Sequence, residues 1–385
     1  MLWSRRFLPR GGAVFVGGGV FKRKIMSKKM LRVALCTAIL LPAAASCVAA
    51  PAAPLPVGFV YISPIGDAGW TTQHDIARKE MEKALGTKIT TKYVENVQEG
   101  ADSERVIRDL AQQGSKLVIT TSFGYMNPTL KVAKQFPDVK FIHVTGYKTA
   151  ANVSNTNARF YEGRYLAGVL AGKMSKSHVA GYVAAFPIPE VLQGVNAFAR
   201  GMRSVDPKAE VKVIWVNSWF DPGKERDAAI TLLGQGADVI THHTDSTAVV
   251  QAAEEKGKYA IAYHSDMKKY GPKAQLGAVT HHWGAYYTKE AQAVLDGKWK
   301  SSATWGGIKD GMVKLEAINA AVPSDVRQLL AAREKDLVSG ALTPFAGPLK
   351  DNEGKLRLDK GALGDEALNK MDYFVEGVVG KVSNK

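Results

Sequence analysis

Aromatic and polar side chains gather in short loops that each follow a predicted β-strand. Large rings in such loops could stack on a planar ligand, and stacking contributes about 0.5–1.5 kcal/mol beyond the burial of area. A nearby carboxylate would orient the ligand by accepting hydrogen bonds from its N–H groups. We therefore predict a binding site for a small aromatic ligand. The residues in these loops are Tyr61, Asp67, Trp70, Ser122, Phe123, Tyr125, Phe186, Asn217, Trp219, Phe220, His242, His243, His264, Asp266, His281, His282 and Trp283.

Three of these residues carry most of the interpretation, and each also has a structural alternative. Trp70 and Trp219 could be buried in a core simply for their area. Asp266 could cap a following helix. Because both tryptophans come just after a strand and beside Gly and Asp, we favour a position in a cleft.

The histidines could in principle hold a metal, because they fall at the ends of three successive strands. Adjacent residues on an extended backbone point in opposite directions, so only one of each neighbouring pair can face a cleft. The spacing also lacks a short ligand motif. We therefore predict no metal and no cofactor, and we expect these rings to hydrogen bond to a ligand or to a hinge. They are His242, His243, His264, His281 and His282.

Enzyme function is not supported by the motifs. The sequence has no Gly-x-Ser-x-Gly elbow, no Gly-rich phosphate loop with its Lys, and no cysteine nucleophile beyond residue 50. We predict that the protein is not an enzyme. A hydrolase that uses the Asp and His cluster is the alternative.

The pattern of the chain predicts α/β architecture. Short β-rich apolar runs alternate with longer amphipathic stretches from residue 55 to residue 297, and the pattern restarts halfway. Two doubly wound lobes with parallel sheets would place a cleft between their strand ends. The predicted strands are 56–62, 89–94, 117–121, 139–144, 179–184, 211–216, 239–241, 259–263 and 276–279, and the predicted helices are 73–85, 103–113, 128–135, 163–174, 189–204, 223–235, 248–256, 284–295 and 324–339.

The positive charge of the chain is concentrated at its beginning. The net charge is +15, and residues 1–50 contribute nine Lys and Arg with no Asp or Glu, which leaves +6 for the rest. No basic run or basic patch with interleaved aromatic residues follows, so we predict no nucleic-acid binding.

Residues 28–50 have the composition of a secretory signal: Lys28, Lys29 and Arg32 precede an apolar run and a small-residue end. We treat residues 1–25 as an upstream extension. The apolar run, about ten residues, is too short to span a bilayer. Both cysteines, Cys36 and Cys47, lie in this leader, so we expect no disulfide in the mature domain. We expect a periplasmic protein, with a lipid anchor at Cys47 as the alternative.

Several segments resemble one known family in their order and spacing. Through these segments the chain resembles the basic membrane protein family of ABC-transporter substrate-binding proteins, which bind purine nucleosides or nucleobases. The resemblance covers essentially the whole mature chain. The segments are GDAGW (66–70), YLAGVLA (165–171), SWFDP (218–222), GADVI (236–240), SD (265–266), SG (339–340) and FAGP (345–348).

The resemblance implies a two-lobe type I periplasmic-binding-protein fold. The chain would cross between the lobes three times, near Phe160, Thr280 and Ile308. Lobe 1 would contain residues 51–160 and 282–308, and lobe 2 would contain residues 161–281 and 309–385.

The resemblance also implies residue roles. Trp70 and Trp219 match the aromatic residues that sandwich the purine, one from each lobe. Asp266 matches an acidic residue that would accept hydrogen bonds from the base edge, an interaction worth roughly 1.5–3 kcal/mol. The other residues that we place in the ligand site are Tyr61, Asp67, Phe123, Glu162, Phe186, His264 and Trp283.

Two departures from the family bear on the ligand. Nucleoside binders have an Asp near the end of the first strand and a Lys after the last strand of lobe 2, where this sequence has Tyr61 and Trp283. Without these charged groups to hold a ribose, we expect a bare nucleobase such as adenine or hypoxanthine. A purine nucleoside and a sugar are the alternatives. The implied partners are the permease and ATPase subunits of an ABC importer, and we expect a monomer.

Overall fold

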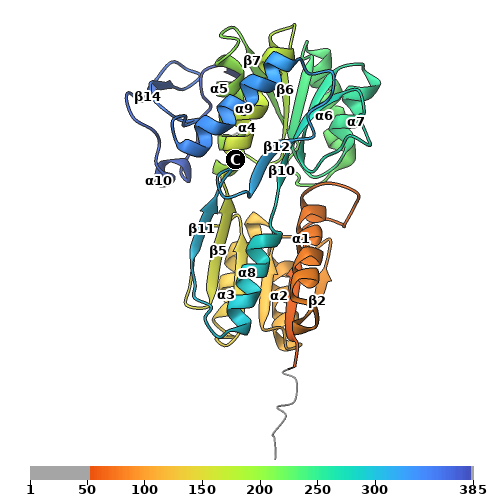
Figure 1. Cartoon of the computed structure of the whole chain (residues 1–385), viewed down its shortest axis with the longest axis vertical. Helices are drawn as coiled ribbons and strands as arrows, with labels where there is room; N and C mark the ends of the chain where they lie inside the picture. Colours follow the sequence, from red (N-terminus) through yellow and green to blue (C-terminus); the bar gives the residue numbers. More distant parts are fainter. Residues whose placement is uncertain (1–52, 383–385) are drawn as a thin grey trace, which may run out of the picture. The chain divides into compact units, whose positions relative to one another are not determined.

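The computed structural model describes residues 53–382 of the chain, so the predicted signal segment and Cys47 lie outside the described residues. Figure 1 shows the arrangement of the elements. The strands are β1 Leu55–Val60, β2 Ile89–Val94, β3 Leu117–Thr120, β4 Lys140–Val144, β5 Val153–Ala158, β6 Val179–Ala184, β7 Glu210–Trp215, β8 Val239–His243, β9 Tyr259–His264, β10 Gln275–His281, β11 Ala303–Gly306, β12 Val313–Glu316, β13 Leu349–Lys350, β14 Leu356–Leu358 and β15 Val378–Val379.

Helices alternate with most of these strands. They are α1 Trp70–Leu85, α2 Ala101–Gln112, α3 Met126–Ala133, α4 Phe160–Met174, α5 Pro189–Arg203, α6 Pro222–Gly234, α7 Ala248–Glu255, α8 Gly284–Leu295, α9 Ser324–Ser339 and α10 Asp365–Leu368, with short 3-10 turns at Gly86–Lys88 and Phe123–Tyr125. None of the described helices is both long and apolar enough to cross a membrane.

The strands form two large sheets with the same internal order. One sheet runs β11-β5-β4-β3-β1-β2, and the other runs β12-β10-β9-β8-β6-β7-β15. All neighbouring pairs in both sheets are parallel, except that β12 pairs antiparallel with β10. Each sheet begins as a doubly wound unit, whose strand order reverses beside its first strand. The predicted α/β fold with two doubly wound sheets is confirmed.

We call the first sheet with its helices lobe 1 and the second sheet with its helices lobe 2. The chain passes between the sheets from β5 to α4, from β10 to α8, and from β11 to β12. Because the described residues belong to one compact unit, the division into two lobes at the predicted boundaries stays a proposal.

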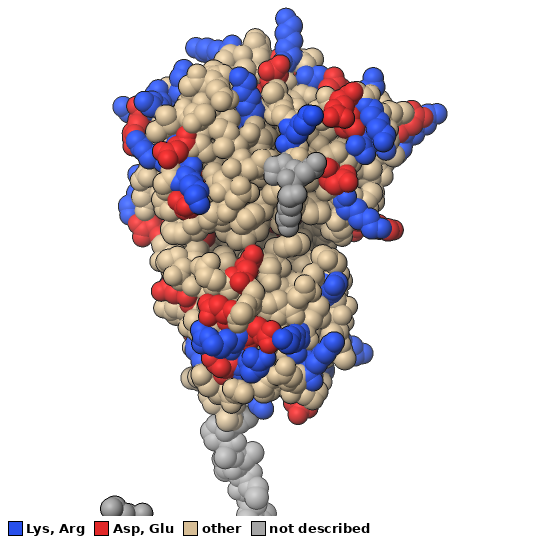
Figure 2. Space-filling model, turned by 180° about the vertical axis from the view of Figure 1, so that it is seen from behind, with Lys and Arg blue, Asp and Glu red and all other residues tan. Residues whose placement is uncertain are grey.

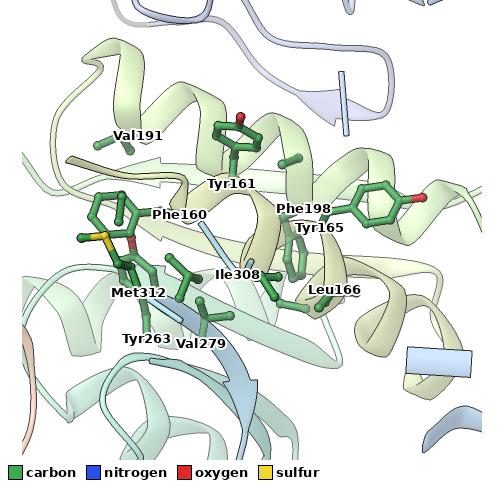
Figure 3. Close-up of a cluster of buried hydrophobic side chains, with 14 of the residues drawn as sticks. Phe160, Tyr161, Tyr165, Leu166, Val191, Phe198, Tyr263, Val279, Ile308 and Met312 are labelled. Carbon is green, nitrogen blue, oxygen red and sulfur yellow. The ribbon is translucent and has the colours of Figure 1, made fainter. Parts of the chain in front are cut away.

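A continuous core joins the two sheets where the chain passes between them. Phe160, Val279, Ile308 and Met312 belong to one buried cluster with residues of both sheets, and Figure 3 shows them together beside Tyr263. On the far faces of the sheets, α2 and α3 cover a second apolar cluster, and α6 and α7 cover a third. The hinge region is therefore apolar and densely packed.

Charged side chains of both signs are interspersed on the face of the molecule shown in Figure 2. Several form exposed pairs within one helix, as Arg105 does with Asp102 and Asp109. Exposed pairs of this kind each contribute about 0–1 kcal/mol. The stability of the fold therefore depends mainly on its apolar clusters.

Candidate functional site

A cavity lies where the carboxyl ends of strands from both sheets meet. This is the switch-point position at which open parallel sheets bind ligands. Lobe 1 contributes the loops after β1, β3 and β4 and the start of α1, and lobe 2 contributes the first turn of α5 and the loops or ends of β7, β8 and β9. The lining residues are Ile62, Trp70, Ser122, Phe123, Thr145, Glu190, Trp219, His243, Thr244, Asp245 and His264.

Trp70 forms part of the lobe 1 wall. It is the first residue of α1, and its indole N–H donates to the backbone carbonyl of Thr121 at 2.7 Å. The ring also meets His74 edge to face, with centroids 4.3 Å apart. Trp70 is 8% exposed, so the ring is held rigidly with only a small part of its surface open to the cavity.

Trp219 forms part of the lobe 2 wall. It follows β7 and is half-buried. Its ring packs on Phe186 with centroids 4.9 Å apart. No described residue accepts a hydrogen bond from its indole N–H. A ligand in the cavity would therefore meet an apolar ring together with an available donor.

Asp245 connects the two lobes at the edge of the cavity. It follows β8, and its carboxylate accepts hydrogen bonds from the Ser63 hydroxyl and from the backbone N–H of Trp70. The backbone N–H belongs to the first turn of α1, where the helix dipole favours an anion. Burial nevertheless dominates and raises the pKa of Asp245 to about 7, although the hydrogen bonds from Ser63 and Trp70 oppose this shift.

Further contacts between the lobes surround Asp245. Gly69 N–H donates to the Ser265 hydroxyl at 2.9 Å, and Gln73 donates to the same hydroxyl at 2.8 Å. Gly69 has a φ of 108°, and a Cβ at this position would collide with Asp245. Glycine is needed here both for its backbone conformation and for the close approach of the lobes.

The remaining polar groups of the cavity are uncharged or weakly acidic. Burial raises the pKa of Glu190 to about 8. Burial also lowers the pKa values of His243 and His264 well below the usual range, and the buried guanidinium of Arg164 adds to this effect in both rings. The site is therefore close to neutral near pH 7, apart from Asp245.

Of the predicted site residues, Trp70, Phe123, Trp219 and His264 line the cavity together. Phe186 lies behind Trp219 and lines an adjoining outer chamber instead. The assignment of these residues to a ligand stays a prediction.

The predicted acidic residues lie outside the cavity lining. Asp266 is exposed, and its carboxylate accepts hydrogen bonds from Lys268 N–H and Gln275. Asp67 is exposed and pairs across the lobes with Lys269 at 2.6 Å. Glu162 accepts the backbone N–H of Ile308 at 2.8 Å, close to where the chain passes between the sheets. Ligand roles for these three carboxylates remain untested predictions.

Tyr61 and Trp283 are buried beside the cavity rather than in its lining. Tyr61 has no exposed surface and stacks on Tyr93. Trp283 is 1% exposed and stacks on His74 with centroids 5.1 Å apart. Trp283 also meets Trp70 edge to face, with centroids 5.9 Å apart, so it packs beneath the wall that Trp70 forms. Tyr61 packs between Phe59 and Tyr93 in lobe 1.

Sequence reasoning missed Glu190 and Asp245. Asp245 comes two residues after β8, so the rule that drew attention to His242 and His243 could have extended to it. Glu190 is in the first turn of α5, six residues after β6. A search confined to the residues just after each strand could not reach it.

The histidines do not assemble a metal site in the described part of the chain. Among residues 53–382, no group of three His, Cys, Asp or Glu side chains is placed to hold a metal ion. His264 and His281 do approach each other, with their Nδ1 atoms 3.4 Å apart. This distance fits a hydrogen bond between two neutral rings.

Two facing doubly wound lobes with a cavity between their strand ends define a two-lobe solute-binding fold. Solved structures support this class. A solute-binding protein from Conexibacter woesei matches with a TM-score of 0.62 and 22% identity, covering 75% of this chain and 98% of that one. A solute-binding protein from Aeropyrum pernix K1 matches with a TM-score of 0.66 and 17% identity, covering 75% and 93%.

The chain belongs to the family of PnrA-like ABC transporter substrate-binding proteins, whose model matches residues 55–341. It is 55% identical to a purine-binding protein of Brucella abortus over 85% of this chain and 94% of that protein. It is also 39% identical, over 84% of this chain and 80% of the relative, to a protein of Haloferax volcanii named for glucose binding in an ABC transporter. The family is a transport component rather than an enzyme family, which agrees with the sequence-based expectation.

Proposed function

We propose that this protein captures a purine nucleobase between its lobes and delivers it to the permease and ATPase of an ABC importer in the periplasmic compartment. The observation that carries the proposal is that Trp70 and Trp219, which come from opposite lobes, line the same cavity. Stacking of a base on an aromatic ring is worth about 1–3 kcal/mol in nucleic-acid-binding sites. The purine-binding relative at 55% identity supports the same ligand class.

Polar groups without partners support a heteroaromatic ligand over a purely apolar one. The indole N–H of Trp219, Nδ1 of His243 and Oε2 of Glu190 are buried without hydrogen-bond partners among the described residues. Buried polar groups normally find partners. A purine could supply both donors and acceptors to them while its faces contact the rings.

The burial of Tyr61 and Trp283 favours a base over a nucleoside. Both are fully or almost fully buried, so neither offers a charged group to ribose hydroxyls at the positions where nucleoside binders of the family carry Asp and Lys. We therefore propose adenine or hypoxanthine as the ligand class.

One observation favours a nucleoside as the second candidate. An outer chamber shares Ile62 and Trp219 with the cavity. Its lining includes Asn96, Gln98 and Asn217, whose amides could bind sugar hydroxyls. A ribose attached to a base in the cavity could occupy this chamber.

Calorimetric titration of the mature chain, denatured and refolded to remove carried-over ligand, tests the proposal. The panel contains adenine, hypoxanthine, guanine, their nucleosides, and glucose. We expect heat from one or more bases and little from the matching nucleosides. Tighter binding of nucleosides than of bases would favour the second candidate, a purine nucleoside, as the ligand. Binding of glucose alone would contradict the purine assignment.

A further inference from the structure

Glu190 is a mostly buried carboxyl group in the cavity wall, and one of its two oxygens, Oε2, has no hydrogen-bond partner among the described residues. Pro189 occupies the first position of α5, where its fixed φ favours the start of a helix, and Glu190 follows it in the first turn. The side chain is 12% exposed. The nearest basic atom is Nε2 of His243 at 3.7 Å, and no described residue donates a hydrogen bond to Oε2.

Glu225, in the same lobe and also in the first turn of a helix, is a carboxyl group with a structural role. It lies in the first turn of α6 and is also buried. Its carboxylate accepts hydrogen bonds from the hydroxyls of Thr244 at 2.8 Å and Ser246 at 2.6 Å, and from Asp221 N–H at 3.0 Å. Glu225 thus has its acceptors satisfied by the protein, whereas Glu190 does not.

Among the described groups that face Glu190, only Asn157 stabilises a negative charge. His243 on β8 is held neutral by burial. Tyr182 on β6 and Tyr263 on β9 lie within electrostatic reach, and burial raises both of their pKa values, so both are neutral phenols. Asn157 on β5 lowers the pKa of Glu190, but burial exceeds this effect and raises it to about 8. Near pH 7, Glu190 is therefore a neutral acid that can donate and accept.

We propose that Glu190, whose Oε2 is unpartnered in the cavity wall, determines specificity by pairing with a ligand edge that carries a ring nitrogen beside an exocyclic group. The inference rests on the proposed function and names the edge that the site recognises. On a 6-aminopurine, the O–H donates to the ring nitrogen and the carbonyl accepts from the amino group. On a 6-oxopurine the O–H donates to the exocyclic oxygen, and the carbonyl accepts from the ring N–H. A carboxylate cannot donate, so deprotonation removes one of the two hydrogen bonds.

The test is calorimetric titration of the refolded wild type with adenine from about pH 6.5 to about pH 9, a range that spans the pKa of Glu190 and stays below the loss of the imidazole proton of adenine. Because only protonated Glu190 can make both hydrogen bonds, we expect affinity to fall by about tenfold as the pH rises through about 8, which corresponds to the loss of one hydrogen bond. Glu190→Gln keeps one donor and one acceptor without titrating. Its side chain cannot lose a proton, so its affinity for adenine should not fall as the pH rises through about 8.

Glu225→Gln is the matched control, since it removes a buried carboxyl group outside the cavity, and it should keep the wild-type pH profile. A pH-independent wild type, or a Glu190→Gln profile parallel to the wild type, overturns the role of Glu190 while leaving purine binding intact. Absence of binding by every purine at every pH overturns the proposed function and this inference together. The wild-type profile needs no substitution, so a folding defect in a variant does not obscure the result.

Discussion

At the residue scale, the proposed site depends on two indole rings. Trp219→Leu removes the ring that follows β7, and we predict about a 5- to 150-fold loss of purine affinity, which corresponds to about 1–3 kcal/mol of stacking. Trp215→Leu is the control, because Trp215 stacks on Phe374 and does not line the cavity. Titration calorimetry measures both variants. Equal losses in the two variants would show that folding, rather than stacking, explains the effect.

Asp245 gives a prediction about pH and stability. Its folded pKa is about 7 against an ordinary value of 3.8, so the folded state binds the proton more tightly than the unfolded state. Its contribution to stability is fully present below about pH 4 and is lost as the pH rises through about 7. The melting temperature of ligand-free Asp245→Asn should therefore fall less than that of the wild type between about pH 5 and about pH 8.

Thermal melts across that pH range compare the two proteins, with Asp227→Asn as an exposed control on α6. Melting curves whose pH dependence is the same in wild type and Asp245→Asn would contradict the raised pKa of this buried carboxyl.

Residue types alone could identify part of the site. Trp70 and Trp219 stood out because aromatic side chains just after strands are expected at a switch point. Asp266 fitted the same pattern, but its carboxylate is exposed and bonded to Lys268 and Gln275. Which side chain turns inward depends on the loop conformation, and a sequence pattern does not specify it.

At the scale of elements, the N-terminus of α1 is the contact that brings the lobes together. Gly69→Ala should weaken purine binding strongly, because a Cβ there meets Asp245 of the other lobe. Gly100→Ala is a matched control, since Gly100 also precedes a helix with positive φ, at 96°, but a Cβ there meets no atom. Both variants should lose comparable stability from backbone strain.

Calorimetry and thermal melts separate the two effects of this pair. Purine affinity should fall in Gly69→Ala alone. A similar loss of affinity in Gly100→Ala would indicate that backbone strain in lobe 1, rather than the contact with Asp245, controls binding.

Most helices and the central strands could be predicted from the alternation of short apolar runs with longer amphipathic stretches. The helices expected at 284–295 and 324–339 coincide with α8 and α9. The strands β5, β11, β12, β13, β14 and β15 were not predicted. β5 has the sequence VSNTNA and is fully buried despite its polar residues, so its place in the sheet follows from neighbouring strands rather than from its own hydrophobicity.

At the scale of the whole molecule, few polar groups hold the lobes together. The contacts include Asp245, Ser265 and the ion pairs of Asp67 with Lys269 and of Arg159 with Asp365. An exposed pair contributes little. We predict that the ligand-free protein samples a more open arrangement and that purine shifts it to the closed one. Small-angle scattering should show a smaller radius of gyration on saturation with adenine, whereas Trp219→Leu at the same concentration should change little.

A radius of gyration that stays constant at saturating ligand would mean that the lobes are already closed without it. Purine binding would then require another route of entry than opening of the lobes.

The most direct test of purine capture between the lobes is a crystal structure of the refolded chain grown with adenine. We predict density for the base between Trp70 and Trp219, with its ring edge within hydrogen-bond distance of Glu190. Density for adenine elsewhere on the molecule, with the cavity between the two tryptophans empty, would contradict the proposed site.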